Sequence, residues 1–111
     1  MGKGEIEEIK ERVKEFKESV RKKFSVEKVI IFGSAARGEM ERDSDVDIIV
    51  ASRKYGRKDV FKITPKLYGE WHENLKIDYP VDIILFNTKE FNKLKKEVSI
   101  VSEALREGIE V

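Results

Sequence analysis

The chain has 111 residues, and we expect residues 1–111 to form one domain of ordinary size. Its 23 Lys and Arg nearly balance its 22 Asp and Glu, which argues against a nucleic-acid binder that works by bulk positive charge. The absence of cysteine excludes disulfides, thiolate metal sites and a cysteine nucleophile, and the single histidine excludes a site that needs several imidazoles. Because no apolar run approaches the length of a membrane span, the expected location is the cytoplasm. A charged fraction of 41% without any glutamine is typical of heat-adapted proteins, so we expect a thermophilic source.

The first half of the chain predicts one helix and two strands. A helix is predicted over Glu5–Phe24, because its apolar residues recur every three or four positions and form one stripe. These residues are Ile6, Ile9, Val13, Phe16, Val20 and Phe24. Short apolar runs rich in β-branched residues then predict strands over 29–32 and 45–50. A polar stretch, 34–44, separates the two strands.

The middle of the chain predicts another helix and a third strand. Thr64 followed by Pro65 is typical of a helix N-cap and first turn, so a helix is predicted over Thr64–Lys76. The preceding stretch, 59–63, fits either a short helix or an irregular arm. Residues Val81–Phe86 predict the third strand.

The last part of the chain predicts one long helix. Asn87 and Glu90 resemble a capping box, and the apolar residues beyond them keep helical spacing until Gly108. These residues are Phe91, Leu94, Val98, Val101 and Leu105. Three strands interleaved with helices predict an α/β or α+β domain, with a mixed sheet of at least three strands flanked by helices.

Three aspartates are the first candidates for chemistry. Asp45 and Asp47 alternate in a strand, so their carboxylates lie on one face. Asp82 lies near the start of another apolar strand, and if the two strands are neighbours the three acids converge. Such a cluster of carboxylate oxygens suits Mg²⁺, and two ions about 3.5–4 Å apart can activate a hydroxyl and neutralise a leaving phosphate.

A glycine and a serine at the end of the first strand are the second candidates. Gly33 lets a ligand approach the backbone, while the amides of the turn and the Ser34 hydroxyl favour phosphate oxygens. Arg37 can add a forked cation to the same phosphates. A triphosphate held by this turn and linked through metal to the acids makes a nucleotidyl-transfer site. The less specific interpretation is that Arg37 pairs at the surface with one of the acids Glu39, Glu41 and Asp43.

Together these segments resemble a known signature. The run Phe32–Gly38 followed by Ser44–Ile48 resembles the Gly-Ser and Asp-x-Asp pattern of the DNA polymerase β-like nucleotidyltransferase superfamily, in its minimal branch. The resemblance implies that Gly33 and Ser34 contact the nucleotide phosphates, with Arg37 nearby. It also implies that the three aspartates hold the metal ions and that Asp82 helps to take the proton of the incoming hydroxyl.

The resemblance also suggests substrates and partners. In the minimal branch, ATP donates AMP to a tyrosine of a small helical HEPN-type protein, and the transferase acts as the antitoxin of a toxin–antitoxin pair. A partner or a second copy of the chain is expected to complete the site. Two alternatives are a non-catalytic module that neutralises its partner by occlusion, and a transferase with a small-molecule acceptor.

Three further side chains suggest a role in binding or catalysis, and a structural role is favoured for each. His72 is interpreted as a surface residue, since the metal mechanism needs no histidine base. Tyr68 and Trp71 are interpreted as core residues of the predicted helix, although either can stack on a nucleobase.

Overall fold

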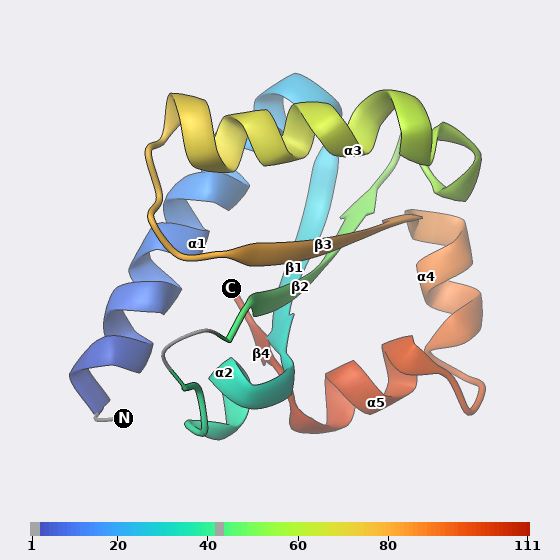
Figure 1. Ribbon diagram of the computed structural model, residues 1–111. Helices are drawn as coiled ribbons and strands as arrows, with labels where there is room; N and C mark the ends of the chain where they lie inside the picture. Colours follow the sequence, from blue (N-terminus) through green and yellow to red (C-terminus); the bar gives the residue numbers. More distant parts are fainter. Residues whose placement is uncertain (1–2, 42–43) are drawn as a thin grey trace.

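The sheet at the centre of the molecule has four strands in the order β3-β2-β1-β4 (Figure 1). The computed structural model describes residues 3–41 and 44–111. The strands are β1 (Val26–Phe32), β2 (Val46–Ser52), β3 (Val81–Asn87) and β4 (Ile109–Glu110). β1 is antiparallel to β2 and β4, whereas β2 and β3 are parallel. The predicted mixed sheet is therefore confirmed, and it includes an edge strand, β4, that the sequence did not predict.

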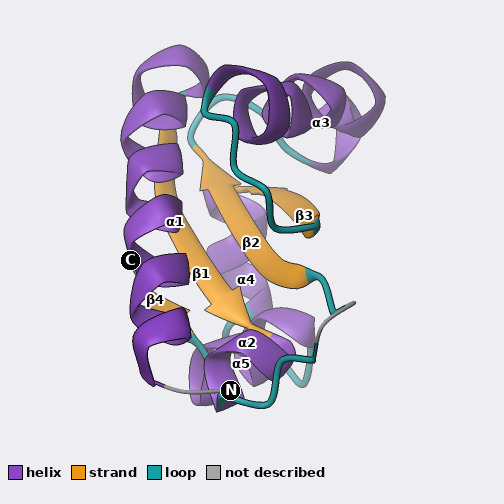
Figure 2. Ribbon diagram, turned by 60° about the vertical axis from the view of Figure 1, so that its left-hand side comes forward, coloured by secondary structure: helices purple, strands orange, loops and turns teal. Residues whose placement is uncertain are grey.

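Two long helical segments cover one face of this sheet. They are α1 (Lys3–Phe24) and α3 (Val60–Gly69), the latter flanked by a 3₁₀ turn, η1 (Arg57–Asp59), and a π-helical turn, η2 (Glu70–Asn74). The apolar stripe predicted for α1 is buried, because Ile9, Val13, Phe16 and Val20 are at most 2% exposed. Burying each such side chain contributes roughly 1.5–3 kcal/mol relative to leaving it in water. This burial fixes α1 along β1 (Figure 2).

Shorter helices cover the other face and one end of the sheet. α2 (Gly33–Arg37) follows β1 directly, and α4 (Thr88–Leu94) and α5 (Ile100–Glu107) follow β3. The cluster under α4 and α5 consists of Ile30, Ile49, Ala51, Phe86, Phe91, Val101 and Ala104. Phe32 and Ile84 lie beside it and are only partly buried, so this face stays partly open around the end of β1. In the described ranges, 3–41 and 44–111, no helix is long and apolar enough to span a membrane.

The prediction of one helix after Asn87 is wrong, because the structure has two. The capping box is present at the start of α4, where the Asn87 side chain accepts a hydrogen bond from the Lys89 amide. The chain then turns, and the Ser99 hydroxyl caps α5 by accepting from the Ser102 amide. Val98, which fits the helical spacing, is fully exposed in this turn. The apolar spacing continues across the turn by coincidence, whereas the serine cap decides where α5 begins.

The prediction of a helix start at Thr64 is also wrong. α3 begins at Val60, so the short-helix alternative for the preceding stretch is the correct one. The Thr64 hydroxyl caps nothing: it is buried and has no hydrogen-bond partner among the described residues. Pro65 lies inside the helix, where its ring leaves the carbonyl of Phe61 without its usual amide.

A buried carboxylate joins η2 to α1. Glu70 is 8% exposed and accepts hydrogen bonds from Lys23 Nζ at 2.8 and 2.9 Å, from Asn74 Nδ2 at 2.8 Å and from the Ser19 hydroxyl. Burial alone raises the pKa of the Glu70 carboxyl, but the hydrogen bonds outweigh it, and the pKa lies below its ordinary value. The fold therefore stabilises the charged form of Glu70.

Glu70→Gln should lower the free energy of unfolding by about 1–2 kcal/mol at neutral pH, because the amide offers no charge to Lys23. A carboxyl whose pKa is lowered by folding stabilises the protein above its ordinary pKa of 4.5, and this stabilisation is lost as pH falls through the lowered value. Urea unfolding at neutral pH and at about pH 3 measures the difference. The exposed neighbour Glu73→Gln is the control. An equal loss of stability at both pH values would contradict the role of the charge.

Candidate active site

One row of residues crosses the sheet from β1 to β3. Phe32 is the register partner of Asp47 in the antiparallel pair, and Asp47 is the register partner of Asp82 in the parallel pair. Side chains at matching positions of neighbouring strands point to the same face. The structure therefore brings Asp47 and Asp82 side by side, near the N-terminal ends of β2 and β3, on the face that α4 and α5 cover only in part.

The third aspartate lies just before β2. Asp45 is exposed, and it precedes Val46, the first residue of the strand. Burial raises the pKa of the Asp47 carboxyl above its ordinary value, and the negative charges of Asp82 and Asp45 raise it further, while Arg37 lowers it in part. Negative charge from three carboxylates is thus concentrated around Asp47.

The turn after β1 lies directly against this cluster. Gly33 opens α2 with a positive φ of 70°, and a Cβ at this position would collide with the Oδ2 atom of Asp47. Only glycine allows both the backbone conformation and the close approach of the carboxylate. Ser34 follows in the first turn of α2 and is half-buried. Gly38 ends the helix in the left-handed region, at φ 71°, as a C-cap.

Arg37 is paired with carboxylates in this structure. Its Nε atom lies 3.2 Å from Glu39 and its Nη1 atom 3.5 Å from Glu107, and its side chain is 43% exposed. The contact with Glu39 matches the surface alternative raised from the sequence, whereas Asp43 lies outside the described residues. Exposed pairs of this kind contribute about 0–1 kcal/mol, so a phosphate can compete for the guanidinium.

Tyr68 belongs to this site, whereas the sequence favoured a core role for it and raised only stacking on a nucleobase as an alternative. From α3 its hydroxyl donates to Asp82 Oδ1 at 3.4 Å and accepts from the Ile83 amide at 2.9 Å. Burial raises the pKa of the Tyr68 phenol, so the group stays neutral and keeps its proton for Asp82. β3 is an edge strand, and Tyr68 covers its outward-facing amide beside the carboxylate. Neither the core role nor stacking on a base, the two roles that the helical pattern suggested for Tyr68, predicts a hydrogen bond to Asp82.

Tyr68→Phe should lower the turnover rate about 10–100-fold and leave KM nearly unchanged, because the phenol orients a carboxylate and does not touch substrate. The measurement is kcat and KM of the nucleotidyl transfer that the sequence predicts, together with the melting temperature. Tyr79→Phe is the matched control, since the Tyr79 hydroxyl contacts Glu8, away from the site. Equal kinetics for the two variants would show that Tyr68 serves the fold alone.

The other two side chains from the predicted helix have structural roles. Trp71 is fully buried, packs edge-on against Phe16 at 5.3 Å between ring centroids, and donates its indole N–H to the Tyr79 carbonyl. His72 is exposed. Both interpretations from the sequence are confirmed, and neither residue reaches the carboxylates.

The donor atoms around Asp47 are of the kind that a hard divalent cation prefers. All three predicted ligands offer carboxylate oxygen, and their mutual repulsion is what a cation offsets. Among the residues that the structure describes, no group of three or more His, Cys, Asp or Glu side chains is gathered closely enough to hold a metal ion. The three carboxylates therefore fit a divalent cation by their chemistry and charge. Because they are not gathered closely enough in this structure, their side chains have to move toward one another for all three to bind the same ion.

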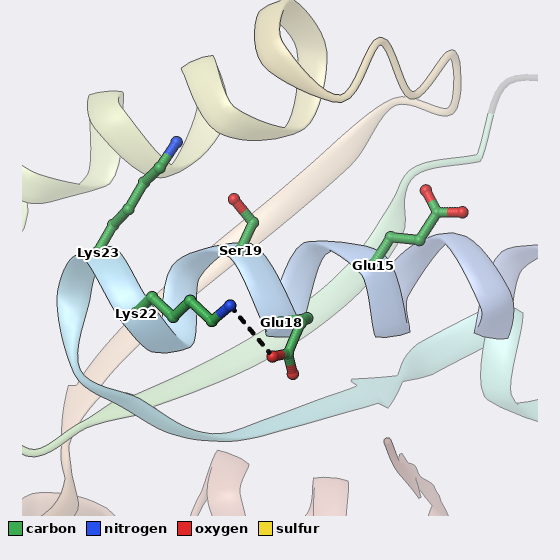
Figure 3. Close-up of a pocket in the computed structure, with 5 residues that line it drawn as sticks. All are labelled: Glu15, Glu18, Ser19, Lys22 and Lys23. Carbon is green, nitrogen blue, oxygen red and sulfur yellow. Dashed lines mark ion pairs between the residues drawn. The ribbon is translucent and has the colours of Figure 1, made fainter.

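A separate hollow lies along α1, away from Asp45, Asp47 and Asp82. It has a volume of about 450 Å³ and is lined by charged residues and a serine, as Figure 3 shows: Glu15, Glu18, Ser19, Lys22 and Lys23. Lys22 pairs with Glu18 at 3.9 Å, and Lys23 binds Glu70. These charges are satisfied by their neighbours, so the hollow adds nothing to the site.

Comparison with known proteins places this geometry in a family. A family model described as a nucleotidyltransferase domain matches residues 13–110, nearly the whole chain. The chain belongs to the nucleotidyltransferase family. A crystal structure of a putative nucleotidyltransferase from Sulfolobus solfataricus covers 99% of this nucleotidyltransferase and 87% of its own chain, with a TM-score of 0.53 and 25% identity. The fold and the transfer of a nucleotide are therefore shared with this family.

Similar sequences carry more specific names. Two proteins of Methanocaldococcus jannaschii are each named a putative protein adenylyltransferase. One is 42% identical over 83 residues, which is 75% of this nucleotidyltransferase and 91% of the relative. The other is 29% identical over 110 residues, with coverage of 94% and 99%. The protein adenylyltransferase MntA of Thermococcus cleftensis is 44% identical over 45 residues, which is 40% of this nucleotidyltransferase and 46% of the relative.

Proposed function

We propose that this nucleotidyltransferase moves AMP from ATP to a hydroxyl group and releases pyrophosphate. The observation that carries the proposal is the pair Asp47 and Asp82, side by side on neighbouring strands, with the Asp47 carboxylate against the glycine turn at Gly33. The names of the relatives support an adenylyl group as the cargo and a protein as the acceptor.

The roles of the residues follow from their places. The backbone amides of the turn at Gly33 and the Ser34 hydroxyl bind phosphate oxygens. Arg37 exchanges its exposed carboxylate partners for a phosphate. Asp82, oriented by Tyr68, accepts the proton of the incoming hydroxyl.

Mg²⁺ is the proposed cofactor, and two ions are expected. Asp45, Asp47 and Asp82 would hold it, and when bound it would activate the attacking hydroxyl and neutralise charge on the leaving pyrophosphate. The concentration of negative charge around Asp47 supports this assignment, because the pKa of its carboxyl is raised by burial and also by repulsion from Asp82 and Asp45, which a cation removes.

The proposed acceptor is a tyrosine of a helical HEPN-type partner protein, and the proposed biological role is that of a cytoplasmic antitoxin. A partner protein suits the surface of the chain, since the apolar side chains of Phe61 and Val98 are 97% and 101% exposed. A second copy of the chain is the other candidate for completing the site.

The test combines the chain with ATP labelled at the α-phosphate, Mg²⁺ and a HEPN-type protein from the same genome. The expected result is label on a tyrosine of the partner, with Asp47→Asn inactive. Complex formation without label would instead indicate neutralisation by occlusion. Label recovered only on small molecules would indicate a small-molecule acceptor.

A further inference from the structure

We propose that the pocket between α2 and α5 binds the nucleobase of the nucleoside triphosphate and favours a base with an exocyclic amino group. The inference rests on the proposed function, in that the phosphates are placed at the glycine turn. The pocket has a volume of about 180 Å³. It is lined by Phe32, Gly33 and Arg37 on one side and by Ile100, Glu103 and Glu107 of α5 on the other.

The position and size of the pocket indicate which part of the nucleotide can occupy it. Gly33 is both a wall of the pocket and the residue in contact with the Asp47 carboxylate. Phe32 is the register partner of Asp47, so the pocket lies one strand away, about 4.8 Å, on the same face of the sheet. Sites for whole ligands of drug size are about 300–1,000 Å³, so this pocket holds a part of the nucleotide. With the phosphates at Gly33, that part is the base.

The apolar walls suit a flat ring. Phe32 is only partly buried, and Ile100 is 45% exposed at the first position of α5. Both side chains leave apolar surface open to water beside the phosphate turn. A nucleobase stacked on an aromatic ring removes such surface from water, and aromatic rings are common platforms for bases.

The polar wall discriminates between bases. Glu103 and Glu107 are four residues apart on α5, so their carboxylates lie on the same side of the helix. Arg106 lies 2.5 Å from the Glu103 carboxylate and 4.0 Å from that of Glu107, and a base can replace exposed pairs of this kind because they contribute little. An ionised carboxylate only accepts hydrogen bonds, so it binds an amino group and repels a carbonyl oxygen at the same position. Adenine presents an amino group at C6, whereas hypoxanthine presents a carbonyl there.

Arg37 couples the pocket to the phosphate turn. Its guanidinium lies 3.5 Å from Glu107 in this structure. When Arg37 turns to a phosphate, the Glu107 carboxylate loses that partner and can accept a hydrogen bond from the nucleotide. Binding of the phosphates and binding of the base therefore favour each other.

The first experiment tests the apolar wall by calorimetric titration of the full chain with ATP and with inorganic tripolyphosphate, both with Mg²⁺. Ile100→Asn should raise the Kd for ATP about tenfold and leave the Kd for tripolyphosphate unchanged. Val98→Asn is the matched control, because Val98 is fully exposed two residues earlier and does not line the pocket. Equal ATP affinities for the two variants would overturn the proposal.

The second experiment tests the polar wall with ATP and ITP, which differ only at C6 of the base. The unmodified chain should prefer ATP at least about tenfold, and the double variant Glu103→Gln, Glu107→Gln should bind the two nucleotides nearly equally. ATP and ITP carry the same triphosphate, so an effect of the double variant on phosphate binding changes both Kd values equally and leaves their ratio unchanged. The loss of the Glu107 partner of Arg37 is one such effect. Equal affinities in the unmodified chain would overturn the base preference. If neither nucleotide nor tripolyphosphate binds, the proposed function fails as well, so the two failures are distinguishable.

Discussion

Asp47→Asn should abolish nucleotidyl transfer and, at the same time, make the metal-free protein more stable. The transfer rate should fall at least about 10³-fold, because the substitution removes one of the carboxylates that would hold the proposed cation. The melting temperature at neutral pH should rise by a few degrees, because the amide removes a partly buried charge and relieves its repulsion from Asp82 and Asp45. A residue kept for function at a cost in stability produces this opposite pair of effects.

The sign of the pH dependence follows from the raised pKa of Asp47. Folding holds the ionised carboxyl in an unfavourable place, so the native protein loses stability as pH rises from the ordinary pKa of 3.8 through the raised value. The advantage of Asp47→Asn should therefore be full at neutral pH and vanish below the ordinary pKa, where both states are protonated. Melting curves without metal across this range measure it.

Two controls make the result specific. Asp78→Asn changes an exposed aspartate in the loop before β3 and should alter neither activity nor melting temperature. Adding Mg²⁺ should raise the melting temperature of the unmodified chain more than that of Asp47→Asn, because a ligand that binds the native state stabilises it. A variant that is inactive and less stable at every pH would show that Asp47 serves mainly the fold.

The sequence predicted those parts of the site that depend on local pattern. The alternation of Asp45 and Asp47 in a strand is such a pattern, although β2 begins only at Val46 and Asp45 lies just before it. The glycine and serine after β1 mark a turn in the same way. The position of Asp82 beside Asp47 depends on β2 and β3 being neighbours, which no local pattern states. The sequence therefore predicted that Asp82 joins the other two acids only if its strand is a neighbour of theirs. In the structure β2 and β3 are parallel neighbours, and Asp82 is the register partner of Asp47.

Other parts of the structure depend on contacts between distant segments. Tyr68 reaches Asp82 because α3 lies over the edge of β3, and nothing near Tyr68 in the sequence distinguishes its hydroxyl from a core phenyl ring. The end of α4 was missed because Val98 continues an apolar spacing that the fold does not use. β4 has only two residues, too few for a recognisable sequence pattern, and it is defined by its pairing with β1.

Gly33→Ala should remove nearly all activity, and Gly38→Ala should not. Both glycines have a positive φ, of 70° and 71°, so each substitution should cost about 1–2 kcal/mol of backbone strain. The two positions differ in what a Cβ would meet. At Gly33 it collides with the Asp47 carboxylate, whereas at Gly38 it meets only the flexible end of Ile6, at 3.3 Å.

The pair separates stability from chemistry, because the backbone penalty is matched. Gly33→Ala has to displace Asp47 from the glycine turn, and a displacement of about 1 Å at a reacting centre can lower the rate about 100-fold. Gly38→Ala should keep transfer within about threefold of the unmodified chain while losing a similar amount of stability. Chemical denaturation and the transfer assay on both variants measure the two quantities. If both alanines reduce transfer equally, the loss comes from α2 as a whole, and the contact between Gly33 and Asp47 has no special part in the reaction.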